Sequence, residues 1–334
     1  MRIKNWYIKI IFTLNIAFTP TNGWSQSKKC LLLSSYHYEY EWNKIIVDTA
    51  KKSLEKDQVC VIKEFYLDSI RKKNLEDINN KAQEVKKLIE TWKPDVTIAI
   101  DDNASRYVVA PYFRNSQRKF VFCGVNWSVK EYGYPYTNAT GMIEVLPLKP
   151  LLENSLKIFN YNYKKISGKA KSLACVTSNR TSDISQCLHI MKMAENKPYN
   201  LSVRLATPAN FTDWKSDFKN VQEKSDIVIF HNYQGIKDWN NHRARIFVKE
   251  HIKKITATTE SWMKDLNMFT IEKTATEQGE YAAKTAIKIL NGERPIDIPI
   301  IPNRRWNFYS TKSLLDKIQV KIPPSIRNKD RSRK

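Results

Sequence analysis

The chain has 334 residues, which predicts two domains or one large one, because a typical domain holds roughly 150 residues. Its 42% hydrophobic and 11% aromatic content is enough for a buried core, and its 8 glycines and 13 prolines exclude a collagen-like or low-complexity chain. The net charge of +22 first suggests an anionic partner such as nucleic acid or a membrane surface. That charge is spread out, however: residues 1–9 carry +3, residues 327–334 carry +4, and +15 remains for the rest of the chain.

The N-terminal segment has the features of a secretory signal peptide. Basic residues 1–9 precede an apolar stretch at 10–18, which is much shorter than the roughly 20 residues needed to cross a bilayer. Polar turn residues and the small residues Gly23 and Ser25 follow. We therefore expect residues 1–25 to be removed and the remainder to be a soluble periplasmic protein, with an uncleaved membrane anchor as the alternative. Export also argues against a nucleic-acid partner.

The remaining chain alternates predicted strands and helices. Short apolar runs predict strands, and apolar residues at helical spacing between them predict helices; Asn74 is placed to cap one helix, and Asn291-Gly292 to end the last. The predicted strands are 30–34, 59–66, 96–100, 120–123, 172–176, 201–205, 227–230, 255–259 and 268–271. This order predicts an α/β fold of two doubly wound halves, each with a parallel sheet covered by helices.

Polar and aromatic residues follow the predicted strands. In open parallel sheets, ligands bind beyond the carboxyl ends of the strands. Hydroxyl, amide and aromatic groups together suit a small polar or amphipathic organic ligand. The candidate ligand-binding residues are Ser34, Ser35, Tyr36, Trp42, Asp101, Asp102, Asn103 and Asn126 in the first half, and Thr181, Tyr233, Glu260 and Trp262 in the second.

Each candidate also has a structural interpretation. Ser34, Ser35, Asp101 and Ser182 are suited to cap helices, and Trp42 lies on the apolar stripe of its predicted helix. If a residue such as Ser35 only caps a helix, its replacement by alanine should lower stability by about 1 kcal/mol and leave binding intact. Adjacent Asp101 and Asp102 point in divergent directions, which argues against paired acid–base catalysis.

The sequence carries no motif of a known catalytic or metal site. It contains no phosphate loop, nucleophile elbow, zinc-protease motif or dinucleotide fingerprint, and its five histidines lack metal-ligand spacing. His37 and His231 remain alternative ligand contacts. We expect a protein without catalytic activity, metal or cofactor; an exported hydrolase is the alternative of a different class.

The five cysteines have no metal-type spacing. Cys30 and Cys60 open two neighbouring predicted strands, so they could lie within bridging distance, but such pairs are usually poorly aimed for a disulfide. We therefore expect five free, mostly buried thiols.

Several segments, in the same order along the chain, resemble the periplasmic solute-binding proteins of an uncharacterised ABC-transporter family and the related sensor domains that precede histidine kinases. These segments are 33–37 with Trp42, 65–69, 94–104, 122–126, 140–144, and 277–279 with 282–283 and 289–292. The resemblance implies the type I periplasmic binding protein fold, in which two α/β lobes joined by three crossovers hold a ligand between them.

Mapped onto this chain, the resemblance implies a first lobe of residues 28–145 plus 266–297, a second lobe of 146–265 plus 298–326, and a basic tail at 327–334. Crossovers are expected near 144–145, 265–266 and 298–300. The chain departs from the family at 271–276, where relatives often carry a Gly-rich turn, so the pocket on that side cannot be inferred from them. The implied protein is a monomer that presents a small molecule to a membrane permease, or alternatively a ligand sensor for a receptor kinase or cyclase.

Overall fold

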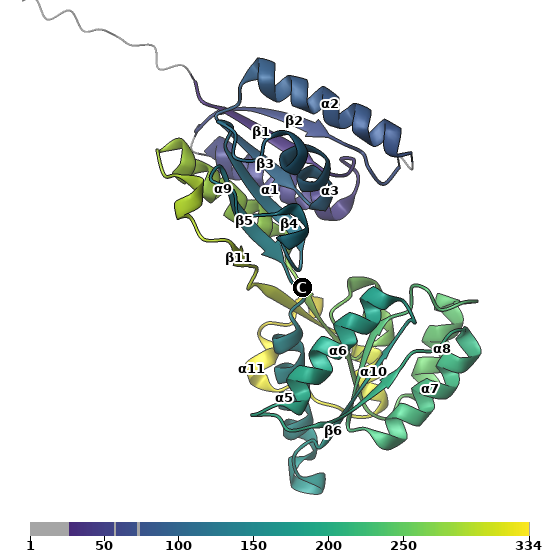
Figure 1. Ribbon diagram of the computed structural model, residues 1–334. Coiled ribbons are helices and arrows are strands. Elements are labelled where there is room, and N and C mark those ends of the chain that lie inside the picture. Colours follow the sequence, from purple (N-terminus) through teal and green to yellow (C-terminus); the bar gives the residue numbers. More distant parts are fainter. Residues whose placement is uncertain (1–26, 57, 72–73, 334) are drawn as a thin grey trace, which may run out of the picture.

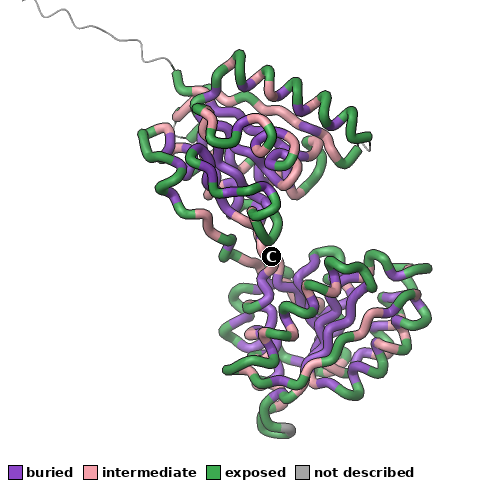
Figure 2. Tube along the Cα trace, viewed as in Figure 1, coloured by how far each residue is buried: buried purple, intermediate pink, exposed green. Residues whose placement is uncertain are grey.

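The computed structural model describes residues 27–56, 58–71 and 74–333. The expected signal peptide, residues 1–25, lies outside these residues. Figure 1 shows two α/β lobes joined by a narrow connection, and Figure 2 shows buried strands running through each lobe beneath more exposed helices. Within the described part of the chain, none of the helices has the length and apolar character needed to cross a membrane.

The first lobe is built on a six-stranded, entirely parallel sheet. Ser34 pairs with Tyr66 on one side and with Ile100 on the other, so these strands end at the same edge. In spatial order the strands are β11 (Ile301–Pro302), β5 (Ala139–Glu144), β4 (Phe120–Asn126), β3 (Val96–Ile100), β1 (Lys29–Ser34) and β2 (Val61–Tyr66).

Alternate residues of these strands enter two apolar clusters, one on each face of the sheet. Helices α1 (Glu41–Lys56) and α9 (Ala275–Leu290) contribute to one cluster. The other receives α2 (Leu75–Trp92) and the consecutive turns α3 (Asp102–Ala104), η1 (Ser105–Val109) and α4 (Ala110–Tyr112). Gly279 lets α1 and α9 pack closely, because a Cβ there would lie 2.5 Å from the Ile46 carbonyl oxygen.

The second lobe has a six-stranded sheet in which only β12 runs antiparallel to its neighbour. Its strands, in spatial order, are β12 (Trp306–Ser310), β10 (Phe269–Lys273), β9 (Ile255–Thr258), β8 (Ile227–Asn232), β6 (Ser172–Thr177) and β7 (Ser202–Ala206). The helices of this lobe are α5 (Leu148–Ser167), α6 (Thr181–Glu195), α7 (Phe211–Lys224), α8 (Asn241–His251), α10 (Lys312–Lys317) and α11 (Pro324–Arg327). Four short helical turns complete the described elements: η2 (Lys130–Tyr132), η3 (Ser261–Leu266), η4 (Pro295–Asp297) and η5 (Arg331–Arg333).

Three crossovers connect the lobes: β5 to α5, β10 to α9, and β11 to β12. The first lies near 144–145, where the resemblance implies it, but the crossovers expected near 265–266 and 298–300 are wrong. Strand β10 belongs to the second lobe, because Phe269 and Ile271 are buried in its core, whereas β11 pairs with β5 in the first. Residues 266–273 therefore belong to lobe 2, and residues 298–302 to lobe 1.

Most regular elements agree with the sequence pattern. Asn74 caps α2 by accepting a hydrogen bond from the Glu76 N–H at 3.0 Å, and α9 ends at Leu290 before Gly292, whose φ is +104°. The sequence pattern did not predict β5, β11, β12, α10 or α11. The expected basic tail also packs on the second lobe, because the buried Asp330 accepts a hydrogen bond from the Ser310 N–H at 3.2 Å.

The expectation of five free thiols is wrong. Cys30 is bonded to Cys60, and Cys175 to Cys187; of the cysteines only the buried Cys123 is free. The parallel pairing of β1 with β2 brings the first pair to a Cα–Cα distance of 5.8 Å, and the packing of α6 beside β6 gives the same distance for the second. Both distances lie within the usual range for disulfides.

We expect denatured, unreduced protein to contain one titratable thiol, rising to five after reduction. Replacing Cys175 and Cys187 together by serine should lower the free energy of unfolding by about 3 kcal/mol. The disulfide closes a loop in the unfolded chain and so lowers the conformational entropy of that chain. Thiol titration and denaturant unfolding measure these two quantities. Five thiols before reduction would contradict the pairing.

Candidate cleft between the lobes

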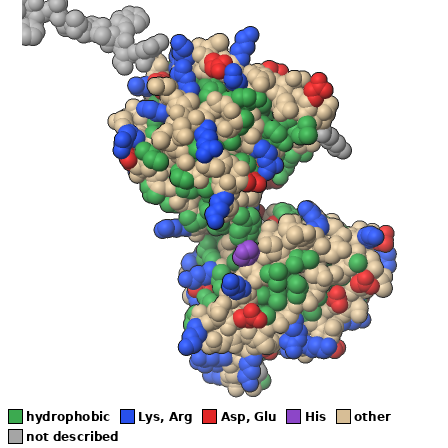
Figure 3. All heavy atoms as spheres, viewed as in Figure 1, with side chains coloured by type: hydrophobic (Ala, Val, Ile, Leu, Met, Phe, Trp, Pro, Cys, Tyr) green, Lys and Arg blue, Asp and Glu red, His purple; other side chains and the backbone are tan. Residues whose placement is uncertain are grey.

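A cavity of about 240 Å³ lies between the two lobes. Figure 3 shows the molecule narrowing at this level. Both lobes contribute to its walls, and most of the lining side chains are polar or aromatic. The lining residues are Asn126, Trp127, Glu144, Leu146, Arg180, Ser182, Asp183, Gln186, Asn232, Gln234, Glu260, Trp262 and Lys273.

An ion pair between Glu144 and Lys273 joins the two lobes at the cavity. Glu144 is the last residue of β5, and Lys273 is the last residue of β10, so each stands where the chain leaves its lobe. The Glu144 side chain is only 5% exposed. Burial acts to lower the pKa of Lys273, but Glu144, Glu260 and Asp101 outweigh this effect and raise it overall, so Lys273 remains protonated.

Two further contacts hold the crossovers together. The Asn303 side-chain oxygen accepts a hydrogen bond from the Val145 N–H at 2.6 Å, which ties the third crossover to the first. The Glu277 carboxylate, at the start of α9, accepts from the N–H groups of Arg304 and Arg305 at 2.7–3.1 Å. The connection is therefore a hydrogen-bonded unit of three chain segments.

Aromatic side chains lie close to this ion pair. The Lys273 ammonium is 4.9 Å from the ring centroid of Trp42 on α1. The Trp42 indole N–H also interacts with the Glu144 carboxylate and acts to lower its pKa, although neither Trp42 Nε1 nor Glu144 Oε2, both buried, has a well-aligned hydrogen bond. One oxygen of the Glu144 carboxylate thus pairs with Lys273, and the other has only the weaker indole donor.

A second carboxylate, Asp101, lies deeper in the first lobe. It accepts hydrogen bonds from the Tyr36 hydroxyl at 3.2 Å and from the Asp102 N–H at 2.8 Å. Its backbone is left-handed, with φ of +73°. Burial, followed by the negative charges of Glu144 and Asp102, raises the pKa of Asp101 to about 8, so it holds a proton near neutral pH.

Asp102 and Asn126 belong to the same polar network. The Asp102 carboxylate accepts hydrogen bonds from the Asn126 amide at 2.6 Å and from the Tyr132 hydroxyl at 2.7 Å. Asn126 pairs with Glu144 in the β4–β5 register, which places both at the rim of the first lobe. This network fixes the Asn126 side chain where it lines the cavity.

Raising the pH should weaken the fold through Asp101. Its folded-state pKa is above the unfolded value near 4, so its stabilising contribution is complete below about pH 4 and is lost as the pH rises toward 8. Between pH 5 and 8 we expect the Tm of the parent protein to fall by about 3 °C or more relative to Asp101→Asn. The exposed Asp77→Asn is the control variant. Parallel Tm curves for the parent and Asp101→Asn would contradict the assignment.

In the second lobe, Asp183 organises the wall formed by α6 and β8. Its carboxylate accepts hydrogen bonds from the Ser178 hydroxyl at 2.6 Å and from the Asn232 amide at 3.2 Å, and lies 3.9 Å from the Arg180 guanidinium. The Asn232 side-chain oxygen accepts from Trp262 Nε1 at 3.1 Å. This chain of bonds holds the indole of Trp262, which is 45% exposed, at the cavity.

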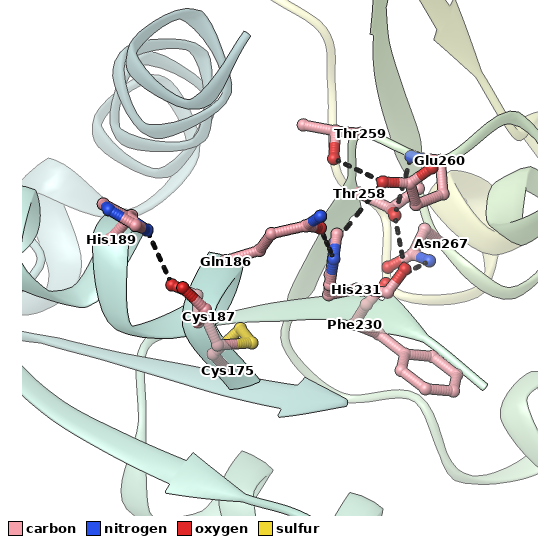
Figure 4. Close-up of a disulfide and its surroundings, with 11 residues drawn as sticks. Cys175, Gln186, Cys187, His189, Phe230, His231, Thr258, Thr259, Glu260 and Asn267 are labelled. Atoms are coloured by element: carbon pink, nitrogen blue, oxygen red, sulfur yellow. Dashed lines mark hydrogen bonds and ion pairs between the residues drawn. A yellow bond between two sulfur atoms is a disulfide. The ribbon is translucent and has the colours of Figure 1, made fainter. Parts of the chain in front are cut away.

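Glu260 and His231 are buried side by side in the same lobe (Figure 4). His231 Nδ1 lies 3.8 Å from Glu260 Oε1, and Nε2 contacts the side-chain oxygen of Gln186. Burial lowers the pKa of His231 to about 4, so its ring is neutral at neutral pH. Burial raises the pKa of Glu260 to about 7, and Lys273 offsets part of that rise.

One aromatic contact crosses directly from lobe to lobe. The ring of Trp127, which follows β4, stacks on His189 of α6 with centroids 5.8 Å apart and planes 16° apart. The backbone N–H of Trp127 donates a hydrogen bond to the backbone carbonyl of Glu144 at 2.9 Å. The stacked ring therefore belongs to a residue that is bonded directly to the first crossover.

The structure brings only some of the predicted residues to the cavity. Asn126, Glu260 and Trp262 line it. Tyr36, Trp42, Asp101 and Asp102 do not line it. Trp42 faces Lys273 and Asp102 accepts a hydrogen bond from Asn126, whereas Asp101 and Tyr36 stand further back in the same hydrogen-bonded chain. Trp42 packs against the α1–α9 core, as its position on the apolar stripe predicts, and its ring also faces Lys273 at the cavity.

The remaining predicted residues have structural contacts. The Ser35 hydroxyl accepts from the Ala104 N–H and donates to the Ile100 carbonyl, as its capping interpretation requires. Ser34 accepts from Asn43, and Asn103 donates to Ser69. Thr181 is exposed at the start of α6, and Tyr233 stacks on Trp239 at 4.7 Å, so neither lines the cavity.

Several residues that line the cavity were not among the predicted ligand-binding residues: Glu144, Lys273, Trp127, Arg180, Ser182, Asp183 and Gln186. Trp127, Arg180 and Ser182 follow predicted strands, so the strand-end rule could have included them. Lys273 comes from the segment where the chain departs from the family pattern. Across the described ranges, no group of three His, Cys, Asp or Glu side chains is placed to hold a metal ion.

Solved structures resemble this arrangement over nearly its whole length. An open, ligand-free substrate-binding protein with adhesive properties from Clostridium difficile has a TM-score of 0.67 at 16% identity, covering 89% of this chain and 96% of that one. An arabinose-binding protein from Geobacillus stearothermophilus has a TM-score of 0.54 at 11% identity, with coverages of 89% and 100%. An ABC domain from Streptococcus pneumonia in complex with L-Trp has a TM-score of 0.52 at 13% identity, with coverages of 90% and 99%.

Neither a protein-family model nor a curated protein sequence matches the chain. At these low identities the structural likeness establishes the fold. Two α/β lobes, each with its own largely parallel sheet, and three crossovers define the type I periplasmic binding protein fold, which confirms the fold expected from the sequence.

Proposed function

We propose that this chain is an exported solute-binding protein that encloses a small organic molecule between its lobes and has no catalytic activity. The observation that carries the proposal is the cavity between the lobes, because side chains from both sheets converge on it. The structural neighbours include substrate-binding proteins, which supports a binding role. Two disulfides support export, because disulfides persist mainly in oxidising compartments.

The mechanism is hinge closure at the three crossovers. Each lobe has its own core, so a ligand that contacts both lobes favours the closed arrangement by its difference in affinity for the two states. A membrane permease would recognise the closed monomer. A receptor kinase or cyclase that reads the same closure is the alternative partner, and the genes beside this one would distinguish a transporter from a sensor.

A thermal-shift screen of residues 26–334 against several hundred metabolites tests the binding role. A bound compound at 100 times its Kd should stabilise the protein by about 2.7 kcal/mol. Small-angle scattering should show a smaller radius of gyration with that compound. If no compound changes either quantity, the binding role is wrong.

For a compound found in this screen, Trp127→Ala and Trp262→Ala should each weaken affinity by about 10-fold or more, because each removes aromatic contact area from one wall of the cavity. Tyr161→Ala, which removes an exposed aromatic ring on α5, is the control. Isothermal titration calorimetry measures the three affinities. Unchanged affinity in Trp262→Ala would show that the second lobe does not contribute, and closure around the ligand would then be the wrong mechanism.

A further inference from the structure

Carboxyl groups outnumber cationic groups on the cavity wall. Three carboxylates line it, from Glu144, Asp183 and Glu260, against two cations, from Arg180 and Lys273. Lys273 pairs with Glu144, and Arg180 lies beside Asp183. Among the described residues, Glu260 forms no ion pair with a Lys or Arg side chain: its neighbour His231 is neutral near pH 7, and Lys273 acts on it only from beyond ion-pair distance.

A second observation also indicates that a cation or N–H donor is lacking on the cavity wall. The Glu144 side chain is 5% exposed and lines the cavity, and its Oε2 atom forms no well-aligned hydrogen bond, only a weaker interaction with the Trp42 indole. A poorly hydrogen-bonded carboxylate oxygen is costly to bury, and an incoming N–H group would satisfy it better than the indole does. Glu144 comes from the first lobe and Glu260 from the second, so one donor between them would contact both lobes.

The aromatic walls fit the same kind of ligand. Trp127 and Trp262 line the cavity together with the carboxylates. Indole rings attract cations through their negatively charged faces and also provide apolar contact for a carbon skeleton. An anionic ligand would find both lining cations beside carboxylates already.

We propose that the cleft selects organic cations, in which a protonated nitrogen lies between Glu144 and Glu260 and the carbon skeleton packs against Trp127 and Trp262. This inference rests on the proposed binding function. Lys273 would then be a specificity-determining residue: its ammonium neutralises Glu144 in the empty cleft and repels a second cation that approaches the same carboxylate.

Two probe series of matched shape test the charge preference. The aromatic series is tryptamine, indole-3-ethanol, indole-3-acetate and L-tryptophan; the aliphatic series is putrescine, 1,4-butanediol and succinate. Calorimetry at pH 8 should find that the amine of at least one series binds 10-fold or more tightly than its neutral, anionic and zwitterionic counterparts. A neutral, anionic or zwitterionic probe that binds more tightly than its matched amine would overturn the inference.

Variants locate the interaction. Glu260→Gln keeps the side-chain shape and should weaken amine binding by about 10-fold or more, whereas Lys273→Gln should strengthen it; an anionic ligand would show the opposite signs for both. Glu223→Gln, the same change on exposed α7, is the control. Far-ultraviolet circular dichroism confirms that each variant is folded.

The pH dependence gives a readout that a purely structural role of Glu260 would not produce. With a Glu260 pKa of about 7, raising the pH from 6 to 8 should strengthen amine binding by about 10-fold, and Glu260→Gln should abolish that change. Glu144, Asp183, Lys273 and His231 are the other titratable groups around it.

The metabolite screen distinguishes a failure of the proposed binding function from a failure of the proposed preference for organic cations. If its hits are neutral or anionic and depend on Trp262, the binding function stands and the cation preference is wrong. If its hits are organic cations other than the probes, and Glu260→Gln weakens them, the preference is supported. If nothing binds, the binding function itself is wrong.

Discussion

The ion pair between Glu144 and Lys273 is the interaction on which the geometry of the cleft depends. Both residues end a strand and begin a crossover, so their contact fixes where the chain leaves each lobe. A carboxylate as buried as Glu144 would be strongly destabilised without a cation, and removing one partner of such a pair typically costs about 3–5 kcal/mol. The pair therefore constrains the backbone at the hinge while it places two charges on the cavity wall.

Rigid lobes leave the crossovers as the place where movement is possible. The disulfide Cys30–Cys60 ties β1 to the residue before β2, and Cys175–Cys187 ties β6 to α6, whose first two turns line the cavity. The connection between the lobes instead consists of short segments held by a few polar contacts, such as the hydrogen bond from Val145 to Asn303 and those from Arg304 and Arg305 to Glu277. Such segments absorb changes in φ and ψ at lower cost than a packed core does.

Sequence patterns predicted most strands because a buried strand is marked by a run of apolar residues that are neighbours in the sequence. Apolar runs identified nine of the strands, and the rule that ligands bind at strand ends selected Asn126, Glu260 and Trp262, which line the cavity. The same rule selected Ser35 and Tyr233, whose side chains turn toward Ile100 and Trp239 instead, because a strand end fixes a position and not a side-chain direction. Lys273 was not predicted because the expected strand ended at residue 271, whereas β10 continues to Lys273 through its pairing with β12, a strand far away in sequence.

The sign of the whole-chain charge says little about the ligand. The net charge is +22, yet the cavity is lined by three carboxylates and two cations. Lys and Arg side chains are scattered over both lobes in Figure 3, where water and salt screen them within about 10 Å. Charges buried between the lobes are screened far less, so a few carboxylates there act more strongly on a bound molecule than many exposed lysines. The cleft of a strongly basic protein can therefore favour a cation, because the local field at the binding site and not the total charge determines which ligand is stabilised.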